Sequence, residues 1–233
     1  MDYLTKVYKE RCKKEFSELG FKCYRKYFYR VINDMFQIFY LHKSVSGSGC
    51  TVEFSSVPLC IGNCIQKTYC GSDHIKMFEN DYSWFQYDRY NENSVNSCVD
   101  EMIGYMRKYL IPFFQSSENS NQAYFATCEF QKNNYRIGVF LADTNLFYMA
   151  LKSKMYDKSI EHLIAKRNHT ETAYKINKEH ARGCLPSEYE ERIQNEIEEI
   201  DYKIKMLTEH NLEYIQKHIH ENERDALLNL GMI

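Results

Sequence analysis

The chain has 233 residues, with 30 Lys and Arg against 32 Asp and Glu, and its formal net charge is −2. Apolar residues make up 44% of the sequence and charged residues 27%, with only three prolines. This composition is ordinary for a soluble globular protein, and it excludes collagen, a disordered chain and a small disulfide-stabilised protein.

An amphipathic helix is predicted over residues 3–19, because apolar side chains recur there at intervals of three and four. Lysines occupy the opposite face of this segment. Gly20 follows directly and is suited to end the helix.

Three strands are predicted next, over residues 21–32, 35–43 and 50–57. Asn33-Asp34 separates the first two, and Ser46-Gly47-Ser48-Gly49 separates the second from the third. Because these connections are short, we expect an antiparallel meander.

The segment from residue 58 to 93 is less regular, with a possible fourth strand at 84–87. A second helix should begin at Ser94, a plausible N-cap, and end near Pro112. The polar stretch 116–122 is the best candidate for a linker. The sequence therefore predicts a first domain over residues 1–115.

The remaining residues, 123–233, are predicted to be mostly helical. A break near residues 154–156 leaves open whether the helix after residue 146 is continuous. Helices over about 157–182 and 187–230 are joined by a short hinge and should fold back as an antiparallel hairpin. The expected fold class is α+β: an antiparallel meander sheet packed by two helices, followed by a helical region with a long hairpin.

Apolar residues along the last predicted helix form a narrow seam with heptad-like spacing. The seam comprises Ile193, Ile197, Ile200, Ile204 and Leu207. Such a seam can pair within one chain or between two copies, so a homodimer through this helix is an alternative to the hairpin.

Charge is unevenly distributed along the chain. Residues 1–30 carry a net charge of +5, residues 146–182 carry +4, and residues 187–233 carry −7. The near-neutral total makes global attraction to nucleic acid unexpected, although it leaves local attraction open.

The sharpest candidate metal site is Cys60-x3-Cys64-x5-Cys70-x3-His74. Three thiolates and one imidazole suit tetrahedral zinc. The two-residue gap of a zinc knuckle is absent, however, and six cysteines lie elsewhere. We therefore expect buried or unreactive thiols at the three cysteines and no cofactor, with zinc as the alternative.

Basic and aromatic residues alternate over residues 22–30. On a single strand, one face would collect Lys22, Tyr24, Lys26, Phe28 and Arg30. Such a face could stack bases and hold phosphates. We favour a half-buried strand whose long cationic side chains extend to water, and keep as the alternative a nucleic-acid-binding protein or an enzyme that uses this basic aromatic face.

Catalytic motifs are absent from the sequence. It contains no phosphate-binding loop, dinucleotide fingerprint, His-Glu-x-x-His pair or nucleophile elbow. We assign no catalytic residue, and the sequence favours a protein that is not an enzyme.

Several short motifs of the first half occur in a familiar order. Leu19-Gly20-Phe21-Lys22 is followed by Phe28-Tyr29-Arg30, then by Phe36 to Ser44 and by Thr51-Val52-Glu53-Phe54, with Leu110-Ile111-Pro112-Phe113-Phe114 much later. This order resembles a family of small bacterial proteins known as a domain of unknown function, over about residues 5–115. His42 departs from the Gln that is usual in the family. The resemblance implies an α+β domain with helices against one face of a sheet, and it implies no activity.

The sequence contains no apolar run long enough to span a bilayer and no signal peptide. We therefore expect a cytoplasmic protein without a membrane partner. Nine scattered cysteines favour reduced thiols in the same compartment. Together with 20 Tyr and 14 Phe, these features favour a bacterial protein-interaction module, for which an immunity-like role is one form.

Overall fold

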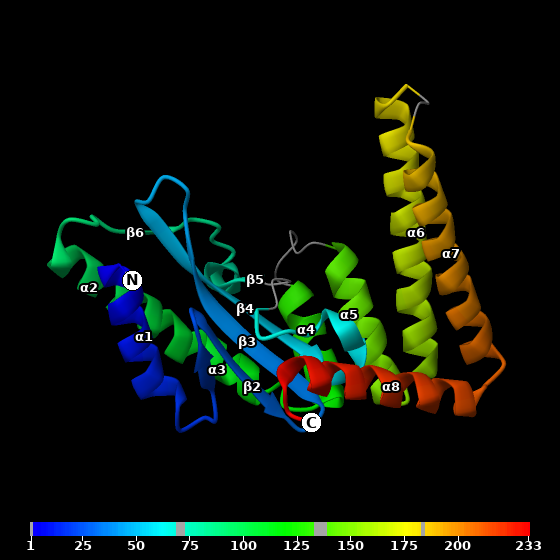
Figure 1. The fold of residues 1–233 in the computed structure, drawn as a ribbon, viewed down its shortest axis with the longest axis horizontal. Coiled ribbons are helices and arrows are strands. Elements are labelled where there is room, and N and C mark those ends of the chain that lie inside the picture. Colours follow the sequence, from blue (N-terminus) through cyan, green and yellow to red (C-terminus); the bar gives the residue numbers. More distant parts are fainter. Residues whose placement is uncertain (1, 69–72, 133–138, 183–184) are drawn as a thin grey trace.

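The computed structural model describes residues 2–68, 73–132, 139–182 and 185–233. An antiparallel sheet occupies the first part of the chain and helices form the rest. Figure 1 shows the sheet with its covering helices at one end of the molecule and a helical hairpin at the other. The predicted α+β class is confirmed.

The sheet is antiparallel throughout, and its first four strands follow one another as a meander. Two short strands then pair with different parts of the fourth, opposite Glu53-Phe54 and opposite Gly49-Cys50. The second of these confirms the strand predicted at 84–87. The strands are β1 (Lys22–Tyr24), β2 (Tyr27–Ile32), β3 (Met35–Lys43), β4 (Gly49–Pro58), β5 (Asp73–His74) and β6 (Phe85–Gln86).

The prediction of one continuous strand over residues 21–32 is wrong. The chain reverses after Tyr24, which pairs with Tyr27 across a two-residue turn. Arg25 makes this turn with a positive φ of 56°. No Gly, Asn or Asp marks the position, so the usual sequence signal of a hairpin is missing.

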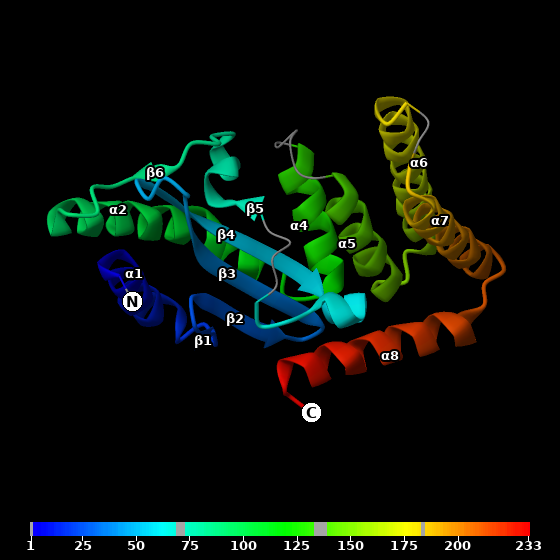
Figure 2. The ribbon, with the colours of Figure 1, turned by 45° about the horizontal axis from the view of Figure 1, so that its top comes forward.

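One face of the sheet is covered by helices from two distant parts of the chain (Figure 2). Phe39 lies at the centre of this layer, stacked on Phe28 with ring centroids 5.1 Å apart and 4.5 Å from Phe16. The surrounding residues form the main apolar core. The helices of this layer are α1 (Tyr3–Phe16), α2 (Glu92–Tyr105), the π-helical turn η3 (Met106–Leu110) and α3 (Ile111–Gln115).

The ends of these helices were only partly predicted. Gly20, with a φ of +82°, closes the turn that follows α1, as expected. Ser94 is not the N-cap of α2, because the Asn91 side chain accepts hydrogen bonds from the backbone N–H groups of Asn93 and Ser94. The hydroxyl of Ser94 instead accepts a hydrogen bond from the N–H of Asp88.

The opposite face of the sheet is covered near the β2–β3 turn by η1 (Leu59–Cys64) and by the last helix, α8 (Leu212–Leu230). Phe36 and Val57 from the sheet pack there with Ala226 and Leu230. The carboxyl-terminal helix therefore completes the core of the amino-terminal sheet.

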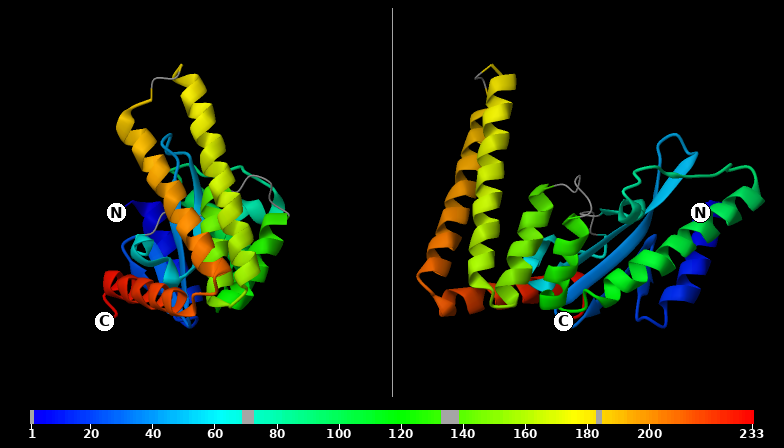
Figure 3. Two further views of the ribbon diagram at one scale, coloured as in Figure 1. Left: turned by 90° about the vertical axis from the view of Figure 1, so that its right-hand side faces the viewer. Right: turned by 180° about the vertical axis from the view of Figure 1, so that it is seen from behind.

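Within the described residues, the helical region has four helices before α8. The helical conformation is interrupted at Lys154, whose φ is +60°. The helix after residue 146 is therefore not continuous. The third and fourth helices run antiparallel and project from the rest of the molecule (Figure 3). The four are α4 (Ser120–Lys132), α5 (Val139–Lys152), α6 (Tyr156–His180) and α7 (Ser187–Thr208).

The predicted helix over 187–230 is two helices, α7 and α8. His210 adopts a positive φ of 51°, and Asn211 then accepts a hydrogen bond from the N–H of Tyr214 to begin α8. This break lets α8 run across the hairpin toward the sheet (Figure 1). Within α7, Ile193, Ile200 and Leu207 are buried in this chain, so the hairpin uses the seam considered for dimerisation.

The segment predicted as a linker, 116–122, includes the first turn of α4 and is bonded to the β2–β3 hairpin. The Asn33 side chain donates to the carbonyl of Glu118, and the Ser120 hydroxyl donates to Asp34. Ser117 is fully buried. None of the helices in the described ranges has both the length and the hydropathy needed to cross a bilayer.

Candidate functional site

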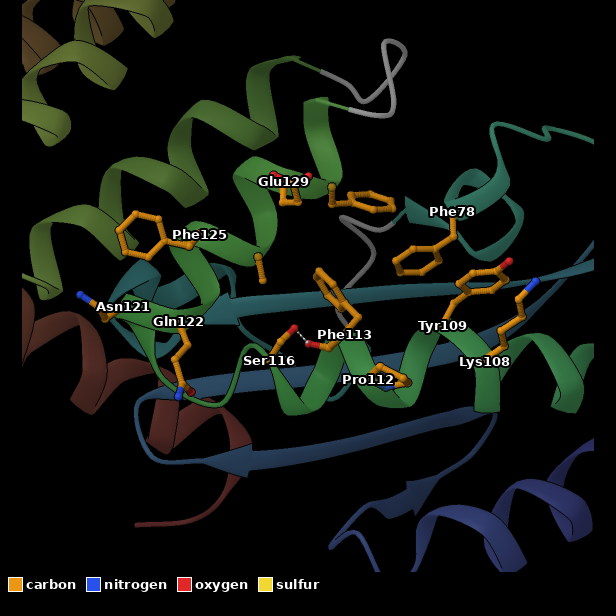
Figure 4. A pocket seen from close by; sticks show the side chains of 12 residues that line it. Phe78, Lys108, Tyr109, Pro112, Phe113, Ser116, Asn121, Gln122, Phe125 and Glu129 are labelled. Carbon is orange, nitrogen blue, oxygen red and sulfur yellow. Dashed lines mark hydrogen bonds between the residues drawn. The ribbon is translucent and has the colours of Figure 1, made fainter.

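An open groove of about 770 Å³ lies between the single-turn helix η2 (Ile75–Glu79), the rod formed by η3 and α3, and helix α4. Figure 4 shows side chains from all three segments pointing toward it. Its twelve lining residues are Phe78, Lys108, Tyr109, Pro112, Phe113, Ser116, Asn121, Gln122, Phe125, Ala126, Glu129 and Phe130.

The short helix η2 places Phe78 in the lining of the groove. Ile75 and Met77 are buried in the main core and fix the orientation of this turn. Asn80 ends it in the left-handed conformation, with a φ of 57°. Phe78 is therefore held at the boundary between the core and the groove.

Proline explains the shape of the second wall. Pro112 has no N–H to donate, so the helix cannot continue its regular hydrogen bonding through this point. The chain forms a π-helical turn just before it, in which the N–H of Ile111 bonds to the carbonyl of Met106. Tyr109 and Phe113 project from this stretch into the groove (Figure 4).

Helix α4 forms the third wall. Its first residue is tied to the sheet, because the Ser120 N–H and hydroxyl both donate to Asp34, at 3.1 and 2.6 Å. Ala123 and Tyr124 are buried against neighbouring helices. Phe125 points the other way and is 59% exposed at the groove.

The floor of the groove is aromatic. Phe78 stacks on Tyr109 with ring centroids 5.4 Å apart and planes inclined by 7°. Its centroid is also 4.7 Å from that of Phe130, which lies 5.8 Å from Phe113. These rings support one another, so the floor is a preformed apolar surface.

Glu79 holds the end of this wall in place. Its carboxylate accepts hydrogen bonds from the hydroxyls of Tyr109 and Tyr105 and from Lys108 Nζ, the last at 3.0 Å. These donors lower the pKa of Glu79 to about 2, and the same contact raises the pKa of Tyr105 to about 12. The anchored Tyr109 ring is thereby kept against Phe78.

The polar side chains of the groove lie at its rim. Ser116 donates its hydroxyl to the carbonyl of Phe113 at 2.9 Å, which leaves it poorly placed as a nucleophile. Lys108 and Glu129 carry opposite charges on opposite walls. An aromatic floor with a polar rim is the general pattern of ligand and peptide sites.

The five residues considered for nucleic-acid binding do not share one face, because β1 and β2 form a hairpin instead of one strand. Phe28 is buried in the main core and Arg30 is 8% exposed, bonded within the protein. Lys22, Tyr24 and Lys26 are exposed. The five residues would share one face only on a continuous strand. The turn at Arg25 divides that strand into two.

Three of the four candidate zinc ligands lie in the described residues, and these three differ in solvent exposure. Cys60 is fully buried, and its Sγ lies 3.7 Å from the carbonyl oxygen of Tyr148. Cys64 is exposed, and His74 Nδ1 is 3.1 Å from the Thr51 hydroxyl. Cys70 lies outside the described residues. Among the residues that the structure describes, no three His, Cys, Asp or Glu side chains gather as a metal site would require.

A cluster of polar side chains lies where β3, β4 and β5 are paired. No pattern in the sequence predicts it. The Glu53 carboxylate contacts the Tyr40 hydroxyl and His42 Nδ1. His74 is directly opposite Glu53 on β5, and the Trp84 ring contacts both histidines edge-on. These residues are spread over positions 40 to 84, and strand pairing brings them together.

The groove was also missed by sequence reasoning. Tyr109 and Phe113 lie on a predicted helix face and Phe78 in the irregular segment, and no local pattern groups them with Phe125 and Phe130 of the helical region. The available signal was the i, i+4, i+5 spacing of Lys108, Pro112 and Phe113 on one side and of Asn121, Phe125 and Ala126 on the other. That spacing does not reveal which face remains uncovered.

Comparison of the chain with protein-family models, with curated proteins and with solved structures gives no match. The resemblance of residues 5–115 to the bacterial family therefore stays a prediction. The function has to be argued from the chemistry of the groove.

Proposed function

We propose that this chain is a non-enzymatic protein-interaction module that binds a short apolar segment of a partner protein in the aromatic groove. The observation that carries the proposal is the preformed floor of stacked rings beside Phe125, a large apolar side chain left 59% exposed. Exposed aromatic residues around an apolar pocket are typical anchors of protein recognition.

The size of the groove favours a segment over a whole protein surface. Twelve residues line it, whereas about 20–30 residues a side form a standard interface. Its open form also distinguishes it from the enclosed cavities that bury most of a small molecule.

An immunity-like role is one form of this proposal, in which the bound segment belongs to a toxin. A toxin gene beside the gene for this chain would favour that form. The proposal itself depends only on the groove and its rings.

The experiment is a selection of random 16-residue peptides displayed on phage, carried out on the wild-type protein. Peptides that bind should lose at least tenfold in affinity on Phe125→Glu, because a carboxylate replaces an apolar anchor at the groove. Since Phe125 is exposed in the free protein, the variant should unfold at the same urea concentration as the wild type within error.

Tyr90→Ser is the matched control. Tyr90 is 82% exposed and lies outside the groove, in the turn before α2. The selected peptides should bind this variant as they bind the wild type. Peptides that bind Phe125→Glu undiminished, or a selection that enriches nothing, would refute the proposal.

A further inference from the structure

Resting on the proposed function, we infer that the segment bound in the groove is an amphipathic helix whose two flanks carry opposite charges. The first support is the backbone of the walls. Both long walls are helical, so most of their N–H and C=O groups are already hydrogen-bonded within their own helices, apart from those at the helix ends and beside Pro112.

An extended peptide would bring unpaired backbone groups over an aromatic floor that offers them few partners. Burying such groups without hydrogen bonds is unfavourable. A helix satisfies its backbone internally and presents only side chains. The groove therefore discriminates against an extended segment and accepts a helix.

The dimensions set the length of this helix. The lining residues of the two walls span 108–116 and 121–130. Each stretch is about 13 Å long at ~1.5 Å per residue, so the bound helix makes contact over about two and a half turns of ~5.4 Å each. Its apolar side chains then recur at positions i, i+3 or i+4, and i+7, facing Phe113 and Phe130.

The charges on the rim set its rotation about its own axis. Lys108 lies on the η3 wall, where it contacts Glu79 at 3.0 Å, and Glu129 lies on the α4 wall, where Lys132 is 3.4 Å away. Acidic residues on one flank of the bound helix would face Lys108, and basic residues on its other flank would face Glu129. Opposed charges of this kind act mainly on specificity.

The test uses two displayed libraries, one of 16-residue helix-forming peptides with variable surface positions and one of proline-rich extended peptides of the same length. We expect binders from the helical library, with at least tenfold weaker binding to Phe125→Glu and unchanged binding to Tyr90→Ser. Circular dichroism of the complex should show added helix. Binders selected on Glu129→Lys should carry acidic residues where the wild type selects basic ones.

Each other outcome counts against the inference. Binders from the extended library that Phe125→Glu weakens would leave the proposed function standing and overturn the helix. Binders whose flanking charges do not respond to Glu129→Lys would overturn the assigned flanks. A wild-type dimer that Phe125→Glu dissociates would place a second copy in the groove instead. Failure of both libraries would remove the proposed function as well.

Discussion

Arg30 and Glu118 are 88 positions apart in the sequence, yet Arg30 Nη2 lies 3.0 Å from Glu118 Oε1. The Arg30 side chain is only 9% exposed. It also donates to Gln37 and to the carbonyl of Leu19, both at 2.8 Å, while Gln37 donates to the carbonyl of Phe114. This network joins the end of α1, the sheet and the turn from which α4 starts, so it positions two walls of the groove.

We predict that Glu118→Ala destabilises the protein by about 3 kcal/mol, because it leaves a nearly buried guanidinium without its carboxylate. We also predict that the double variant Arg30→Met/Glu118→Gln loses less free energy of unfolding than Arg30→Met alone and Glu118→Gln alone lose in sum. Urea unfolding measures Glu118→Ala and the three variants of this cycle, Arg30→Met, Glu118→Gln and the double variant. As a control, Lys132→Met removes an exposed pair with Glu129 and should change stability by less than about 0.5 kcal/mol. Additive effects at Arg30 and Glu118 would show that the two are not coupled.

Two glycines should respond to alanine in opposite directions. Gly62 has a φ of +81°, and a Cβ there would lie 3.1 Å from the Asn222 side chain, which bonds the carbonyl of Cys60. Gly62→Ala should cost about 1–3 kcal/mol and loosen α8 from η1. Gly104→Ala, in the interior of α2 with nothing within 4 Å of the new Cβ, should stabilise by about 0.5–1 kcal/mol.

Thermal unfolding of the two glycine variants, compared with the wild type, provides the measurement. If Gly62→Ala leaves the stability unchanged, the contact between α8 and η1 can shift to make room for the new methyl group. In that case the last helix would be less firmly bound to the sheet than its packing indicates.

Asp73 should make stability depend on pH. Burial, reinforced by the neighbouring Glu53 carboxylate, raises the pKa of Asp73 from 3.8 to about 6. Because the folded chain holds this proton more tightly than the unfolded chain, the contribution of Asp73 is fully present below pH 3.8 and is lost as the pH rises through about 6. The loss amounts to about 3 kcal/mol at most, from 1.36 kcal/mol per unit.

Asp73→Asn removes this titration while keeping the shape of the side chain. The free energy of unfolding of the variant, minus that of the wild type, should therefore rise between about pH 4 and pH 6.5. Urea unfolding at several pH values gives this difference directly. A difference that stays constant across the window would contradict the prediction.

Glu79→Gln should act on the groove more than on the fold. The amide accepts weaker hydrogen bonds than a carboxylate, so Tyr109 would be held less firmly against Phe78. We expect several-fold weaker binding of the selected peptides, with unchanged unfolding. The pKa of Tyr105, which the Glu79 contact raises to about 12, should fall toward its ordinary value.

A titration of tyrosine ring carbons by NMR measures the Tyr105 shift in the Glu79→Gln variant. Tyr124 is the internal reference, because burial raises its pKa to about 12 without any contact to Glu79. A Tyr105 resonance that titrates as in the wild type would show that Glu79 does not restrain this wall.

Local patterns were sufficient for much of the fold. Helix α1, strands β3 and β4, and the antiparallel pair α6 and α7 follow from apolar spacing and from the turns between them. The β1–β2 turn and the α7–α8 break were missed, since Arg25 and His210 adopt positive φ values that their residue types seldom signal.

The sequence by itself determined the periodic elements, the α+β class and the surplus of aromatic residues, because each depends on residues close together in the chain. Only the tertiary structure decided which aromatic faces are covered. Phe114 packs into the core while Phe113, its neighbour, lines the groove, and the difference comes from Phe39 on one side and Phe130 on the other. Solvent exposure is a property of all the segments around a side chain, and those segments are brought together only by folding.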